Sequence, residues 1–207
     1  MIVNDKLHWD SIYKTNDDGS LGWYENNFNR YQRLISQMSL IESPLTFIAG
    51  CGTSLLSETL ISLGHQLIIN DISSTALNRL KNKLNNKNQV KWFHHDISKP
   101  FTLVGDLLDL WFDRAVLHFL LDQDDINQYF KNIKKNVKHG GWVHLEEFSK
   151  DGASRCAGLN IHQYSCDELS HCLGDEFTLK HSMNYVYTNP EGSKRPYIIA
   201  SFKRLSI

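Results

Sequence analysis

The sequence has no long apolar run and almost no charge imbalance, and each absence excludes a class of protein. No apolar segment approaches the roughly 18 residues of a membrane-spanning helix, so no membrane partner is expected. The formal net charge of the 207 residues is -1, which gives no overall positive field for nucleic acid. The first residues also lack the basic and then apolar pattern of a secretory signal.

Metal-ligand and redox patterns are missing as well. The four cysteines, Cys51, Cys156, Cys166 and Cys172, form no Cys-x-x-Cys pair, which argues against a zinc knuckle or a redox motif. The histidines show no i,i+4 pair, so no metal site is expected. Reduced thiols and the lack of a leader pattern favour a cytoplasmic protein. Monomer and homodimer both remain open.

What the sequence does contain is a regular alternation of short apolar runs and helical patterns. The runs predict strands over residues 45–49, 66–70, 90–94, 107–112 and 142–148. Between them, apolar residues at helical spacing predict helices over 54–63 and 73–84, and a third that Asp124 caps and that ends at 139–141. This alternation predicts an α/β, Rossmann-like fold with a mostly parallel sheet.

The two ends of the chain depart from this alternation. Residues 177–187 and 196–202 read as two strands joined by a turn, which predicts a C-terminal antiparallel hairpin and a seven-stranded sheet. Residues 1–42 lie outside the repeat, look helical and are rich in aromatic residues. We therefore expect one domain, with a core of residues 43–207 and an N-terminal helical extension or lid.

The predicted strand ends carry residues suited to a nucleoside-containing cofactor, because ligands of open α/β sheets bind beyond the carboxyl ends of the strands. Gly50 and Gly52 allow a tight turn after the first strand. With Cys51 and Ser54 they lead into a helix N-terminus, whose free N–H groups can hold a carboxylate.

The next two strand ends supply the remaining cofactor contacts. Asp71, 19 residues beyond Gly52, can accept hydrogen bonds from ribose hydroxyls. Asp96 can accept from an adenine amino group, and Ile72 and Ile97 can sandwich the ring. Each residue alone also fits a turn or a helix cap, so their succession along the strand ends carries the prediction.

Two cofactors fit such a site, NAD and S-adenosylmethionine (SAM). The pyrophosphate of NAD favours a third glycine for close helix packing, and Leu55 occupies that position. SAM has no pyrophosphate and tolerates the loss. The sequence therefore favours SAM, with an NAD-dependent reductase as the rival.

Two further elements support this choice. Residues 8–13 read His-Trp-Asp-Ser-Ile-Tyr, and residues 113–120 read Asp-Arg-Ala-Val-Leu-His-Phe-Leu. The chain thereby resembles class I SAM-dependent methyltransferases, and most of all a bacterial group that carries both elements. Gly22 stands where that group has serine before Trp-Tyr, and no proline follows Gly152. The resemblance implies the fold and the cofactor but not the substrate.

The resemblance also suggests the residues around the methyl group. Asp113, Arg114 and His118 follow the fourth predicted strand and are candidate catalytic residues, with His118 as a proton acceptor. A structural ion pair for Arg114 and a core position for His118 are the alternatives. Trp9, Tyr13 and Trp23 can close over the cofactor or can simply pack the extension on the sheet.

The function expected from the sequence is thus transfer of a methyl group from SAM to an unidentified acceptor, a small molecule or a protein lysine. The alternative is a module or partner subunit that binds SAM or S-adenosylhomocysteine (SAH) without catalysis. No motif in the sequence identifies the methyl acceptor.

Overall fold

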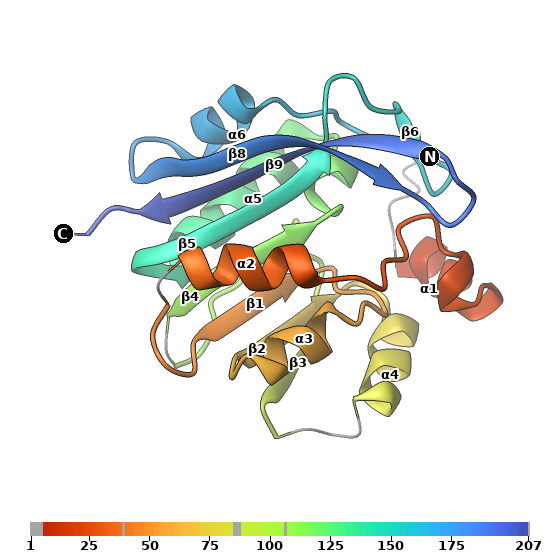
Figure 1. Cartoon of the computed structure of the whole chain (residues 1–207), viewed down its shortest axis with the longest axis horizontal. Coiled ribbons are helices and arrows are strands. Elements are labelled where there is room, and N and C mark those ends of the chain that lie inside the picture. Colours follow the sequence, from red (N-terminus) through yellow and green to blue (C-terminus); the bar gives the residue numbers. More distant parts are fainter. Residues whose placement is uncertain (1–5, 39, 85–87, 106, 207) are drawn as a thin grey trace.

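Seven strands form one twisted sheet with helices on both of its faces (Figure 1). This computed structural model describes residues 6–38, 40–84, 88–105 and 107–206. The strand order is β3-β2-β1-β4-β5-β9-β8, parallel from β3 to β5 and antiparallel at β9 and β8. The strands are β1 (Leu45–Ala49), β2 (Gln66–Asp71), β3 (Val90–His94), β4 (Leu108–Arg114), β5 (Val137–Phe148), β8 (Phe177–Thr188) and β9 (Lys194–Arg204). The Rossmann-like α/β sheet and its terminal hairpin are confirmed.

The helices bury the two faces of this sheet. One core cluster joins the sheet to α5 (Gln123–Asn136) and α6 (Cys166–Leu173). The other joins it to α2 (Asn29–Gln37), α3 (Leu56–Ser62) and α4 (Ser74–Lys83). Within the described ranges, no helix is both long and apolar enough to cross a bilayer.

The predicted helix before β5 is displaced at both ends. Asp122 caps α5, not Asp124, because its side chain accepts a hydrogen bond of 2.9 Å from the Asp124 N–H. The helix ends at Asn136, and β5 begins at Val137 without a turn. The Gly140-Gly141 pair therefore lies inside β5, where the register with β4 shifts between Leu108 and Leu110. A side chain at Gly141 would press on the Leu108 carbonyl oxygen.

The N-terminal extension is only partly helical. Helix α1 (Lys6–Thr15) is followed by a short 3-10 turn (Asp18–Ser20) and by a non-helical stretch that carries Trp23 before α2 begins. The Asp10 carboxylate accepts from the Ser73 hydroxyl (2.6 Å) and the Thr75 N–H (3.0 Å) at the start of α4. These contacts fix α1 beside the carboxyl ends of β1 and β2 (Figure 1).

Candidate functional site

A cavity of about 840 Å³ lies at the carboxyl ends of the central strands. Its floor comes from the loops after β1, β2, β3 and β4, and α1 with the segment after it forms one wall. A two-stranded hairpin, β6 (Arg155–Cys156) and β7 (Leu159–Asn160), contributes the other wall. This is the edge of an open α/β sheet at which ligands bind.

The loop after β1 depends on two glycines. Gly50 and Gly52 have φ values of 46° and 57°, which other residues adopt only with strain. A side chain at Gly50 would overlap Val116, and one at Gly52 would overlap the Tyr13 hydroxyl. The loop can therefore pack tightly against both the β4 loop and α1. Burial raises the pKa of the Cys51 thiol, so this residue packs in the loop as a neutral group.

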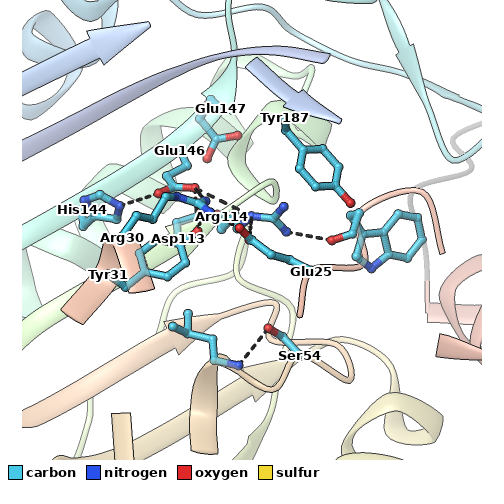
Figure 2. Close-up of polar contacts among 12 residues, drawn as sticks. Glu25, Arg30, Tyr31, Ser54, Asp113, Arg114, His144, Glu146, Glu147 and Tyr187 are labelled. Atoms are coloured by element: carbon cyan, nitrogen blue, oxygen red, sulfur yellow. Dashed lines mark hydrogen bonds and ion pairs between the residues drawn. The ribbon is translucent and has the colours of Figure 1, made fainter. Parts of the chain in front are cut away.

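Most N–H groups of this loop are bonded within the protein. The N–H of Cys51 donates to the Asn70 carbonyl oxygen (2.8 Å), and that of Gly52 donates to Asp71 (2.7 Å). The Ser54 hydroxyl accepts from the N–H of Leu56, the first residue of α3 (3.2 Å; Figure 2). The helix N-terminus that the sequence suggested as a carboxylate site is thus largely engaged.

Asp71 lies at the end of β2 with its carboxylate between two backbone donors. Its Oδ2 accepts from Gly52 N–H and its Oδ1 from Ser73 N–H (2.8 Å). Burial raises the pKa of Asp71 to about 6, although the two backbone hydrogen bonds oppose the shift. Each carboxylate oxygen has a second lone pair, so this cavity-lining group can still accept from a ligand.

The loop after β3 forms the far end of the cavity. Asp96, Ile97 and, from the β2 loop, Ile72 all line this end. The Asp96 Oδ1 accepts from the Ser98 N–H (2.9 Å), and the Asn132 amide holds the Ile97 carbonyl from α5 (2.9 Å). These bonds hold Asp96 and the backbone of Ile97 in place at the cavity.

Three of the predicted site residues, Gly52, Asp113 and His118, are not among the described residues that line the cavity. Gly52 lies just behind it. The fully buried Asp113 carboxylate accepts from Leu117 N–H (3.2 Å) and from the Tyr129 hydroxyl (2.5 Å). His118 is also fully buried, with Nδ1 2.7 Å from the Glu147 carboxylate.

The length of β4 explains the position of Asp113. The sequence suggested a strand that ends at residue 112, whereas β4 continues to Arg114. Successive side chains of a strand point to opposite faces. Asp113 therefore points to the α5 face, and Arg114 points to the opposite face, where it lines the cavity.

Arg114 holds the N-terminal segment against the sheet (Figure 2). Its Nη1 donates to the Trp23 carbonyl oxygen at 2.9 Å. Its Nε lies 3.3 Å from Glu25 Oε2 and 3.7 Å from Glu146 Oε2, and its guanidinium lies over the Tyr187 ring at 5.0 Å. The structural ion pair that the sequence left open for Arg114 is present, and it involves Glu25 of the N-terminal segment.

The ion pairs continue into the core on the same face (Figure 2). Glu146 accepts from Arg30 Nη2 (2.7 Å) and the Tyr31 hydroxyl (2.8 Å), and its Oε1 lies 3.0 Å from His144 Nε2. Burial acts to raise the pKa of Glu146, but His144 and the two arginines lower it to about 2. We call Glu25, Arg30, Arg114, His144 and Glu146 the arginine network.

Aromatic rings from the extension line the cavity wall beside Arg114. Trp9 packs edge-to-face on Phe119 (4.9 Å between centroids) and on Trp23 (5.8 Å), and Tyr13 packs edge-to-face on Trp23 (6.2 Å). His8 Nε2 lies 3.1 Å from the Ala157 carbonyl oxygen, which links α1 to the β6–β7 hairpin. Trp9, Tyr13 and Trp23 thus meet at the cavity from two separate segments.

Comparison with known proteins agrees with this architecture. Residues 48–141 match a family model described as a methyltransferase domain. The SAM-dependent methyltransferase of Anabaena variabilis ATCC 29413 has a TM-score of 0.77 at 14% identity, over 96% of this chain and 93% of that one. The chain has the fold of SAM-dependent methyltransferases.

Two more solved methyltransferases share this fold. The SAM-dependent methyltransferase of Methanosarcina mazei has a TM-score of 0.71 at 16% identity and covers 88% of this chain and 100% of that one. The N-methyltransferase NodS of Bradyrhizobium japonicum WM9, solved with SAH, has a TM-score of 0.68 at 18% identity, over 95% and 98%. No curated protein sequence matches the chain.

On this methyltransferase fold, several cavity residues have no recognisable sequence signal. Glu25 follows the Trp-Tyr pair, and the β6–β7 hairpin adds Arg155, Cys156 and Asn160. Charged residues in irregular segments have no periodicity, so only the three-dimensional packing brings them to the cavity. The Arg-Cys-Ala-Gly-Leu stretch, which resembles the bacterial group, is the one clue to the hairpin.

Proposed function

We propose that this chain is a methyltransferase that binds SAM in the cavity at the carboxyl ends of β1 to β4. The observation that carries the proposal is convergence: residues from four successive strand ends and from the extension line one cavity on a methyltransferase fold. The similar solved structures include one with bound SAH, which supports the same cofactor here.

The cavity residues fit SAM part by part. The Asp71 carboxylate would accept from the ribose hydroxyls, and Asp96 from the adenine amino group. Ile72 and Ile97 would cover the adenine faces. The rings of Trp9, Tyr13 and Trp23 would surround the positively charged sulfonium, which aromatic faces attract.

SAM supplies a methyl group already activated by its sulfonium, so the protein mainly has to orient the acceptor and exclude water. Positioning of this kind can contribute about 7–11 kcal/mol to lowering a barrier. Arg114 binds the Trp23 carbonyl oxygen and would thereby hold the Trp23 ring at the cavity wall. Arg114 is accordingly a positioning residue, and the buried Asp113 and His118 support the loop after β4.

We further propose that residues 1–42 form the lid of a single domain. Asp18 pairs with Arg79 (2.7 Å) and Lys83 of α4, and its carboxylate also accepts from the Thr53 hydroxyl (2.8 Å). These contacts tie the extension to the cofactor side of the cavity. The four free cysteines favour a cytoplasmic location.

A matched pair of aspartate variants tests the cofactor site. Asp71→Asn removes the charge that would face the ribose, and we expect SAM affinity to fall by about tenfold or more. Asp109→Asn is the control, because Asp109 is equally buried but lies at the opposite end of the sheet, where it accepts from the Leu45 N–H (2.9 Å). Equal effects of the two variants would contradict the proposed site.

Turnover distinguishes an enzyme from a binding module. Radiolabelled SAM incubated with a broad set of peptides and small molecules should yield a labelled product and SAH. Binding of SAM without any transfer would favour a non-catalytic module or a partner subunit.

A further inference from the structure

The acceptor side of the cavity contains one unusual carboxylate. Glu25 lies between α1 and α2, lines the cavity beside Arg114, and has a side chain that is 9% exposed. Its Oε1 is bonded by Arg30. Its Oε2 is buried and makes no hydrogen bond with any described residue, although the Arg114 Nε is 3.3 Å away. A buried acceptor without a donor is costly, so a donor from a ligand is expected there.

The charges around Glu25 do not favour an anion. Arg30 from α2 and Arg114 from β4 both also pair with Glu146 from β5, so two carboxylates balance two guanidiniums. The Tyr187 hydroxyl from β8 donates to the Tyr24 carbonyl oxygen and adds no charge. A cation that enters the cavity therefore meets a balanced network with one unused carboxylate lone pair.

The aromatic wall favours a cation as well. Trp9 meets Trp23 at an interplanar angle of 74° and Phe119 at 77°. Rings at near right angles form a corner that presents faces as well as edges, and aromatic faces attract ammonium groups. Glu25 lines the same cavity as these rings.

Two further arginines lie at the β6–β7 hairpin, and each bonds to a neutral group. The Arg155 guanidinium donates to the Gly158 carbonyl oxygen (2.8 Å) and closes the turn between β6 and β7. Its side chain is therefore used in shaping the hairpin. The Cys156 thiol lies 3.4 Å from Arg195 Nη1, which is its polar partner. Both arginines are thus held at the β6–β7 hairpin by neutral partners.

We infer that the methyl acceptor is an amine that enters as an ammonium ion and donates an N–H to Glu25 Oε2. This inference rests on the proposed function and names its substrate class. The ammonium transfers one proton to the Glu25 carboxylate, which frees the nitrogen lone pair. The nitrogen then bonds to the methyl carbon of SAM while the carbon–sulfur bond breaks, and its electron pair stays on sulfur. The products are a methylated ammonium and SAH, and Glu25 returns its proton to water.

A series matched in shape tests the substrate class. The intact protein with SAM is offered benzylamine, phenylmethanethiol and benzoate, together with larger amine, thiol and carboxylate sets that include a lysine peptide. SAH release and product mass are followed. We expect methylation of amines only. Transfer to a thiol or carboxylate but not to an amine overturns the inference, as does binding of SAM without transfer to any amine.

The pH dependence of Glu25→Gln tests the role of the carboxylate. We expect kcat/KM for the best amine to fall about 100-fold at pH 7, with SAM affinity changed less than threefold. The variant should regain about one decade of rate per pH unit as the free amine accumulates, whereas the wild type should level off. A variant with wild-type kcat/KM, or one without recovery at high pH, contradicts the inference.

A second variant covers the case in which Glu25→Gln does not fold. Phe119→Leu removes one aromatic face and should raise KM for the amine several-fold with little change in SAM affinity. An unchanged KM contradicts the inference. If the wild-type protein did not bind SAM at all, the proposed function itself would be refuted. Failure of the amine inference and failure of the proposed function are therefore distinguishable.

Discussion

Glu146 and Glu147 are neighbours on β5, both fully buried, yet their surroundings drive their carboxyl groups in opposite directions. Glu146 faces the N-terminal segment, where arginines and a histidine lower its pKa to about 2 against the effect of burial. Glu147 faces α5, where burial raises its pKa to about 8. Partners, and not burial alone, decide whether a buried carboxyl group is charged.

The two acids differ because they lie on opposite faces of the sheet and meet different partners there. The arginine network connects Glu146 through Arg114 to the cavity wall at Trp23. On the other face, Glu147 meets the Asp113 carboxyl, whose pKa is also raised, first by burial and then by Glu147. There Glu147 braces the loop after β4, because it accepts from the N–H of His118 (3.1 Å). Four predictions test this difference.

The largest expected effect follows from removing the ionised acid. Glu146→Leu leaves Arg30 and Arg114 with only Glu25 as a counter-charge. Breaking a buried ion pair typically costs about 3–5 kcal/mol, and we expect that loss in the free energy of unfolding. Urea denaturation measures it, with Glu147→Gln as the control. A loss below about 1 kcal/mol would show that the network contributes little.

The pH dependence of stability should separate the two acids. A group whose pKa is raised in the folded state stabilises the fold below its unfolded pKa, and this contribution is lost as pH rises. The contribution of Glu147 to the free energy of unfolding therefore declines as pH rises from about 4.5 to 8. A lowered pKa does the reverse, and the contribution of Glu146 is lost as pH falls from about 4.5 to 2.

Denaturation at several pH values measures both slopes, each at most about 1.4 kcal/mol per pH unit and per group. Glu147→Gln should flatten the decline between pH 5 and 8, whereas Glu146→Gln should leave it in place. The same slope in both variants would refute the assignment of opposite charge states.

Arg114→Lys keeps the charge of the network but loses the planar fork that reaches the Trp23 carbonyl oxygen. We expect SAM to bind about tenfold more weakly, which corresponds to about 1.4 kcal/mol. Arg204→Lys is a matched control, since Arg204 also donates to a backbone carbonyl, that of Lys134 (2.7 Å), but at the far end of the sheet. Calorimetry compares the SAM affinities of the two variants. Equal affinities would show that Arg114 does not contribute to SAM binding at the cavity.

The smallest effect is expected at Tyr129, on the α5 face of the sheet. Tyr129→Phe removes the hydroxyl that donates to Asp113 (2.5 Å) and should cost about 1 kcal/mol of folding free energy. Because Tyr129 and Asp113 are not among the residues that line the cavity, SAM affinity should stay at the wild-type value. Weaker SAM binding would show that the two faces are coupled.

The sheet could be predicted from the sequence because its signals are local. Strands β1 and β3 end where the apolar runs end, Asp71 is the last residue of β2, and Asp96 lies two residues beyond β3. Glycine and aspartate at these ends reflect backbone geometry, which neighbouring residues impose. The part of the cavity at the ends of β1, β2 and β3 was therefore accessible to sequence reasoning.

The part of the cavity around Arg114 was not accessible in the same way. A two-residue extension of β4 decides that Asp113 is a core residue and that Arg114 faces the cavity, and apolar periodicity does not resolve such a difference. Arg30 meets Glu146 across 116 residues of sequence, and Glu25 meets Arg114 across 89 (114 − 25). Contacts at such separation come from packing, so the arginine network had no signal in the sequence.

The most direct test of the whole account is a calorimetric titration of the wild-type chain with SAM. We predict one binding site per chain with a Kd below about 1 mM, competition by SAH, and no binding of NAD. An absence of SAM binding at about 1 mM, or binding of NAD in its place, would contradict the assignment of this cavity to a methyl donor.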